Sequence, residues 1–160
     1  MSNVLIGIIG VILFIGLALA GALFLGPRFQ ESTQNSKASA SVQALSQITN
    51  AINAYELQEG AKLGNNSVSD LTPGYLKTVP SPQFWDGTPT IANGVSARLL
   101  YVTMSEDSRS VCSAINRQIR STSEIPVVLN WQSPTDGAIG TTGCYDTGTP
   151  NNILVLWSKV

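Results

Sequence analysis

The feature that most constrains this chain is an apolar run near its start, VLIGIIGVILFIGLALAGALFL at residues 4–25. It contains no charge, and Arg28 is the first ionisable side chain in the sequence. As an α-helix it would be about 33 Å long, which is enough to cross a hydrocarbon core of about 30 Å. Because the run is hydrophobic on every helical face, it predicts a helix surrounded by lipid or by other helices.

The cysteines indicate on which side of a membrane the rest of the chain folds. The sequence has two, Cys112 and Cys144, both far from the apolar run. An even pair behind an export-type segment predicts one disulfide and an oxidising compartment, with two buried free thiols as the alternative. In the chain-entropy model such a disulfide contributes about 3–4 kcal/mol.

The apolar run differs from a cleaved signal peptide. Ala18-Leu19-Ala20 resembles a cleavage site, but the three residues before Val4 include no Lys or Arg. The run also exceeds the usual apolar core of about 7–15 residues, and no cysteine follows it for lipid attachment. We therefore expect a retained membrane helix. The few basic residues nearby do not orient it, so the expected disulfide is the better guide.

A second helical pattern follows the apolar run directly. Gly26-Pro27 predicts a kink or local unwinding, because proline removes a backbone donor and clashes with the preceding turn. From Arg28 to Glu59 there is no Gly or Pro, and Gly60 predicts the helix end. The apolar residues of this half recur on one helical face and are expected to pack on the remaining domain: Val42, Leu45, Ile48, Ile52 and Tyr55.

The next stretch predicts a long loop and then a strand. Prolines and glycines recur through residues 60–95, which favours irregular structure. Within it, Asp86-Gly87 predicts a tight turn around which a short hairpin is expected. Residues 96–104 (SARLLYVTM) are rich enough in β-branched and aromatic side chains to predict a strand.

The last third predicts a short helix and two more strands. The helix is expected after Asp107 or Ser108, because apolar residues recur every four positions from Val111. The strands are expected at 125–131 and 152–157, with a loop rich in Gly, Thr and Pro between them that holds Cys144. A long helix followed by several strands distant in sequence predicts an α+β fold with an antiparallel sheet of about four strands.

The sequence offers no residues for catalysis, cofactors or metals. It has no histidine, and its two distant cysteines do not make a zinc site. Asp136, Asp146 and Asn151 share a loop, but solvated loop residues explain them better than a Ca²⁺ site does. Nine Lys plus Arg against ten Asp plus Glu leave no basic patch for nucleic acid. We therefore expect neither an enzyme nor a nucleic-acid-binding protein.

The order of these features resembles a type IV pilin. That family has an apolar helix half, a Gly/Pro joint, an amphipathic second half, an αβ-loop, an antiparallel sheet and a C-terminal disulfide-bounded region. The second half of the chain is more similar to the type IVb subclass, which includes the pilins of conjugative thin pili. The similarity rests on Cys112 at the start of a helix after a strand, and on Cys144 before Asn151 and the apolar 153–157.

The resemblance implies a structural subunit of an extracellular pilus for adhesion, conjugation or motility. Residues 1–27 would form the membrane and filament-core helix, and 28–160 the pilin domain, divided into 28–59, 60–95 and 96–160. Its partners would be further copies of itself, the inner membrane before assembly, and the pilus assembly machinery. The expected core contacts come from Val4, Leu5, Ile8, Val11, Ile12, Phe14, Ile15, Leu19 and Leu23.

Two positions depart from the family pattern. No basic leader ending in Gly is visible before the apolar helix; if the sequence is the mature form, Met1 would be the processed terminus, and processing at Gly7 is the poorer alternative because it also lacks a basic leader. The acidic residue that pilins usually carry at the fifth mature position is replaced by Leu5, and the first carboxylate is Glu31. A minor pilin, a type II secretion pseudopilin and a membrane-anchored periplasmic protein that does not polymerise are the alternatives.

Overall fold

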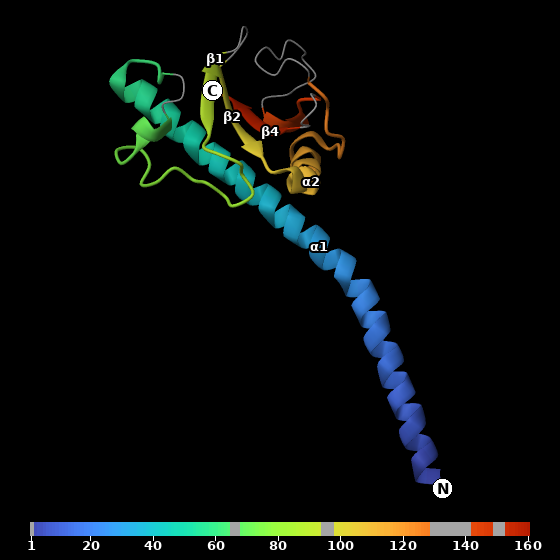
Figure 1. Cartoon of the computed structure of the whole chain (residues 1–160). Helices are drawn as coiled ribbons and strands as arrows, with labels where there is room; N and C mark the ends of the chain where they lie inside the picture. Colours follow the sequence, from blue (N-terminus) through green and yellow to red (C-terminus); the bar gives the residue numbers. More distant parts are fainter. Residues whose placement is uncertain (1, 65–67, 94–97, 129–141, 149–152) are drawn as a thin grey trace. The chain divides into compact units, whose positions relative to one another are not determined.

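A computed structural model of the chain describes residues 2–64, 68–93, 98–128, 142–148 and 153–160 (Figure 1). The chain forms two compact units, Met1–Gln34 and Asn35–Val160. The first helix, α1, spans Ser2–Glu59 and so contributes to both units. The predicted long N-terminal helix is therefore confirmed.

Of the two positions singled out on α1, the structure confirms the helix end at Gly60. Gly60 has a positive φ of 65°, and its N–H donates to the Glu56 carbonyl at 3.1 Å. A left-handed glycine with this bond ends a helix, because only glycine adopts that conformation without steric cost. Gly26 and Pro27 lie within the helix, without the interruption that local unwinding would cause, and a kink there stays a prediction.

The second unit contains one antiparallel sheet, as predicted. Its strands are β1 (Thr90–Asn93), β2 (Arg98–Met104), β3 (Thr142–Asp146) and β4 (Leu154–Lys159). They lie in the order β1-β2-β4-β3, and all three pairings are antiparallel. The last strand of the chain is thus central, which explains why it is apolar along most of its length.

The hydrophobic core lies between this sheet and the second half of α1. Because successive side chains on a strand point to opposite faces, alternate residues of β2 and β4 reach the same cluster as the helix. That cluster contains Leu45, Ile48 and Ile52 of α1 together with Leu100, Val102, Met104, Leu154 and Leu156. The intervening strand residues form a second buried cluster of Leu99, Tyr145, Val155 and Trp157.

A second helix, α2 (Arg109–Arg120), follows a short 3-10 turn, η2 (Glu106–Ser108). Ser108 is its N-cap residue, as expected, although its side chain makes no capping hydrogen bond. Val111, Cys112, Ala114 and Ile115 are buried, and these residues add α2 to the main core. The helix packs mainly on β3.

Several strand positions differ from the sequence prediction. β1 and β3 lie in stretches that were predicted as loop, so Cys144 is on a strand. No hairpin forms at Asp86-Gly87; instead the Asp86 N–H donates to the Thr103 carbonyl at 2.8 Å, beside β2. Pairing with distant partners creates these elements, and local sequence composition does not report it.

The strand expected at 125–131 is also different. Within its described part, residues 125–128, the pairing is an isolated parallel bridge between Val127 and Asp146. The remaining positions of that prediction, 129–131, lie outside the described residues. β4 begins at Leu154, two residues later than expected.

Candidate functional site

The first candidate site is the apolar half of α1. Every large hydrophobic side chain from Val4 to Leu25 is at least half exposed, and exposure reaches 78% at Leu23. This set includes all the predicted core-contact residues: Val4, Leu5, Ile8, Val11, Ile12, Phe14, Ile15, Leu19 and Leu23. A continuous apolar surface of this kind marks a lipid-contacting or protein-contacting site.

The glycines of this half are also open. A Cβ added at Gly7, Gly10, Gly16 or Gly21 would meet no heavy atom within 4 Å outside the helix's own turns. Small residues on an exposed helix let a second helix approach closely. By length and composition, this is one helix apolar enough to cross a membrane or to act as an N-terminal anchor.

The second half of α1 is different, because its apolar stripe is covered. Leu45, Ile48 and Ile52 are buried in the main core, while Val42 and Tyr55 are partly buried against it. The Tyr55 ring meets the Tyr75 ring edge-on, with centroids 5.4 Å apart. The same helix therefore carries one uncovered and one covered apolar segment.

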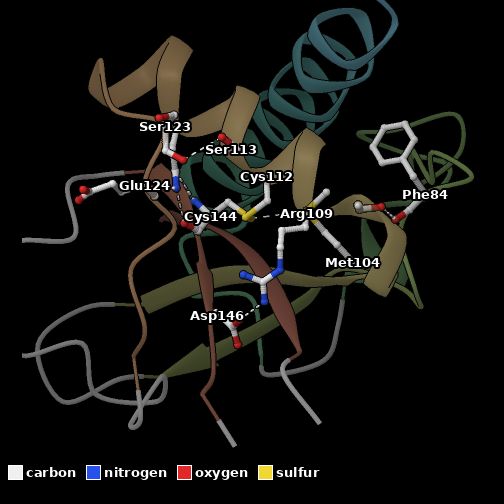
Figure 2. The surroundings of a disulfide bond; sticks show 11 residues. Phe84, Met104, Arg109, Cys112, Ser113, Ser123, Glu124, Cys144 and Asp146 are labelled. Atoms are coloured by element: carbon white, nitrogen blue, oxygen red, sulfur yellow. Dashed lines mark hydrogen bonds and ion pairs between the residues drawn. A yellow bond between two sulfur atoms is a disulfide. The ribbon is translucent and has the colours of Figure 1, made fainter. Parts of the chain in front are cut away.

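The second candidate site is the disulfide-bonded region (Figure 2). Cys112 on α2 is bonded to Cys144 on β3, with Cα atoms 5.4 Å apart, which confirms the predicted disulfide. Both cysteines are buried, and the Met104 sulfur lies 3.7 Å from the Cys144 sulfur. The bond joins the short helix to the edge strand of the sheet inside the core.

Asn116 completes the attachment of α2 to β3. It is fully buried. Its side-chain amide donates to the Cys144 carbonyl at 2.7 Å and accepts from the Cys144 N–H at 2.9 Å. The same amide nitrogen donates to the Glu124 carbonyl at 2.9 Å. Because β3 is an edge strand, this amide occupies main-chain groups that would otherwise be open to another strand.

Asp146, two residues further along the same edge of β3, also has main-chain partners. The Asp146 N–H donates to the Pro126 carbonyl at 2.9 Å, and the Val128 N–H donates to the Asp146 carbonyl at 2.8 Å. The Asp146 carboxylate pairs with Arg109 of α2, as Figure 2 shows, and accepts from the Gly148 N–H at 3.0 Å. Both of its oxygens thus have protein partners.

The calcium alternative weighed from the sequence has little support in the described part of the chain. Asp146 has Arg109 as its charge partner, and Asp136 and Asn151 lie outside the described residues. Among the residues that the structure describes, no three His, Cys, Asp or Glu side chains are close enough to hold a metal ion.

A polar cluster connects the end of α1 to β2 and to the loop that follows the helix. Arg98 at the start of β2 pairs with Glu56, and also donates to the Leu63 carbonyl at 2.7 Å. The Leu63 N–H donates to the same Glu56 oxygen at 3.1 Å. One turn later, the Tyr75 hydroxyl donates to Glu59 at 3.2 Å.

These bonds change the titration of the groups that make them. Desolvation alone would raise the pKa of Glu56, but the hydrogen bonds from Arg98 and Leu63 outweigh it and lower that pKa below 4.5. Desolvation, and then the bond to Glu59, raise the pKa of the Tyr75 hydroxyl. At neutral pH the Glu56 carboxylate is therefore ionised and accepts hydrogen bonds, and the Tyr75 hydroxyl is protonated and donates one.

Sequence reasoning did not single out Asn116 or Arg98. The partners of Asn116 on β3 are 28 residues away, and Arg98 lies 42 residues from Glu56. No local pattern reports pairs at such separations. One signal in the sequence points to Asn116: a polar residue on the apolar face of a predicted short helix will be buried and therefore needs a hydrogen-bond partner.

Comparison with family models, curated proteins and solved structures finds no match to this chain. The architecture can still be compared with the expected one. A long N-terminal apolar helix, an antiparallel sheet and one disulfide are all present, and together they are consistent with a pilin-like fold.

Proposed function

We propose that this protein is a structural subunit of a type IV pilus and polymerises through residues 4–25. One observation carries the proposal: an uncharged helix segment long enough to cross a bilayer exposes every large apolar side chain. Water is an unfavourable neighbour for such a surface. Lipid before assembly, and other copies of the same helix after it, are the two surroundings that fit.

The assembly step exchanges one apolar surrounding for another. The subunit is held in the inner membrane by residues 4–25, and assembly machinery moves it into a bundle of identical helices. Since lipid tails are about as apolar as leucine, this exchange has little net hydrophobic free energy, and packing shape decides the arrangement. The open positions at Gly7, Gly10, Gly16 and Gly21 allow close helix approach.

The disulfide-bonded domain has features that would keep it stable outside the cell. A disulfide between Cys112 and Cys144 persists in an oxidising compartment, and Asn116 and residues 126–128 cover part of the β3 edge. Edge protection matters for a protein displayed in many copies, because open strand edges pair with one another. Such filaments would serve adhesion, conjugation or motility.

Leu5 sets this subunit apart within the proposed class. Its side chain is uncharged and exposed where pilins of the family usually carry an acid. With Met1 as the mature terminus, the fifth position would carry no acid to pair with a neighbour's terminal amine. In this proposal, apolar packing and contacts between domains set the register of the filament.

A non-polymerising membrane anchor is the second candidate, because the same exposed helix would also hold a single subunit in a bilayer. In a pilus subunit Leu13 would contact neighbouring helices in the filament, whereas in a membrane anchor it would stay in contact with lipid. Leu13 is 62% exposed near the middle of the apolar segment, where an aspartate costs roughly 3 kcal/mol in an apolar surrounding.

The test compares Leu13→Asp with Leu13→Met, which conserves volume and apolarity. Filaments sheared from cells are counted by electron microscopy, and the chain is quantified in the membrane fraction. We expect wild-type filament yield from Leu13→Met and at least a tenfold loss from Leu13→Asp. Normal filament yield from Leu13→Asp would contradict a packed apolar bundle, and a wild-type protein found only in membranes would favour the anchor.

A further inference from the structure

The second half of α1 has an exposed face without charge, and the proposed function does not explain it. From Ala38 to Tyr55 the sequence contains no Asp, Glu, Lys or Arg. The shorter helix α2, by contrast, exposes Arg109 and Arg117 within 12 residues. Charged side chains are depleted at the centres of protein interfaces, because a buried charge costs free energy. The charge-free face of α1 is therefore typical of a surface that a partner covers.

This face also has the residue spacing of a contact between two helices. Five of its exposed residues alternate in steps of three and four: Gln43, Ser46, Asn50, Asn53 and Leu57. These are the steps between the a and d positions of paired helices, and we call the five residues the α1 seam. Leu45, Ile48 and Ile52 lie on the opposite side of the helix, in the main core. The seam therefore faces away from the core of its own domain.

The chemistry of the seam fits a second copy of the same helix. An amide both donates and accepts hydrogen bonds, so identical Asn or Gln side chains satisfy one another across a contact. Among the residues that the structure describes, the amides of Gln43, Asn50 and Asn53 bond no other residue. A charged partner would find no opposite charge on the seam, and an apolar partner would leave these amides buried without hydrogen bonds. A second copy avoids both costs.

The membrane location in the proposed function decides the orientation of such a pair. Residues 4–25 would insert every copy into one membrane in the same direction, so two copies approach each other with their α1 helices parallel. Parallel helices that present the same face meet about a two-fold axis, which places each residue level with its own copy. Confinement to the membrane also raises the effective concentration of the domains, so a mostly polar seam needs little affinity of its own.

We propose that two copies of this chain pair in the membrane before assembly, through the α1 seam and in register. Asn50 then lies opposite the partner's Asn50, and a paired amide at an a position fixes the register of two helices. Leu57 lies opposite the partner's Leu57, which removes from water a side chain that is 86% exposed in the single chain. The short side chain of Ser46 lets the helices approach closely. The inference rests on the membrane location in the proposed function, and it does not require a filament.

The first test is disulfide cross-linking between copies of Asn50→Cys. The variant is produced in cells that lack the pilus assembly machinery, so that every copy stays in the membrane. The membranes are oxidised, and the chains are separated on a denaturing gel without reductant. We expect at least half of the chain as a linked dimer. The same experiment is run on Asn53→Cys, for which we expect a similar yield.

Gln58→Cys is the matched control for both variants. Gln58 is exposed on the same helix, but it is rotated by about 100° from Leu57. We expect less than a tenth of this variant as a dimer. Equal dimer yields from Gln58→Cys and Asn50→Cys would overturn the proposal, and so would a link at position 50 that forms only in assembled filaments.

The second test separates a paired seam from chance collision. Leu57→Cys reports dimer formation, and Asn50→Asp is added to it, which would place two like charges opposite each other. We expect at least a fivefold loss of the linked dimer, and less than twofold for Gln83→Asp, which adds the same charge on an exposed loop. A membrane-bound chain that gives no dimer at position 50 or 57 overturns this inference alone. A wild-type chain that is absent from the membrane fraction overturns the proposed function with it.

Discussion

Glu56 is the residue through which three separate segments of the domain meet. Its carboxylate lies on α1, its ion-pair partner Arg98 begins β2, and the Leu63 N–H belongs to the loop after the helix. Both side chains are partly shielded from water. An arrangement in which one carboxylate accepts from two donors favours the ionised form over the protonated one.

Glu56→Gln tests this arrangement through its pH dependence. The folded-state pKa of Glu56 lies below 4.5, so the stabilising contribution is present above pH 4.5 and is lost as the pH falls through that lower value. We expect the variant to be less stable by about 0.5–1 kcal/mol at pH 7, as for a partly exposed ion pair. The difference should shrink as the pH falls below 4.5, because the protonated carboxyl loses its ion pair with Arg98.

The measurement is thermal unfolding of the full chain in detergent micelles at pH 7 and at pH 3. Glu124→Gln is the control, because Glu124 is exposed and its hydrogen bond from Asn116 uses its main-chain carbonyl. A stability difference between wild type and Glu56→Gln that stays constant from pH 7 to pH 3 would contradict the assigned ion pair.

At the scale of elements, the β3 edge depends on a side chain from a neighbouring helix. Asn116 of α2 bonds both main-chain groups of Cys144, while the disulfide links Cys112 on the same helix to the same strand residue. Two different attachments therefore hold one residue of an edge strand. The covalent bond limits separation, and the amide satisfies the buried polar groups.

Asn116→Ala should destabilise the domain by about 2–4 kcal/mol. The substitution leaves the Cys144 N–H and carbonyl without their partner in a buried site, and each such group costs about 1–3 kcal/mol. Ser113→Ala is the control from the same helix, because its single bond to the Ser123 carbonyl is exposed. Chemical denaturation measures both variants, and equal losses for the two would show that Asn116 does not hold the edge.

The elements themselves were unequally predictable from sequence. α1, its end at Gly60 and the stripe at Leu45, Ile48 and Ile52 follow from local periodicity, and a helix is built from local contacts. β3 lies in a stretch predicted as loop because that stretch is rich in Gly, Thr and Pro; its strand state comes from antiparallel pairing with β4. The disulfide prediction is confirmed, but it rested on the number of cysteines and the expected oxidising compartment, not on local structure.

At the scale of the whole molecule, one chain combines an uncovered apolar helix segment with a disulfide-bonded α+β domain. The first unit has an exposed apolar surface with open glycines, and the second has its own core. The apolar helix half can be predicted from the sequence, because charge and hydropathy are properties of composition.

The central claim is that residues 4–25 leave the membrane to form the core of a filament. Helical reconstruction by electron microscopy of filaments sheared from producing cells tests it most directly. The account predicts filaments built from this chain, with residues 4–25 of many copies packed as a helical bundle at the axis. It is contradicted if the chain is absent from such filaments and stays in the membrane, or if the axis is built from the disulfide-bonded domain instead.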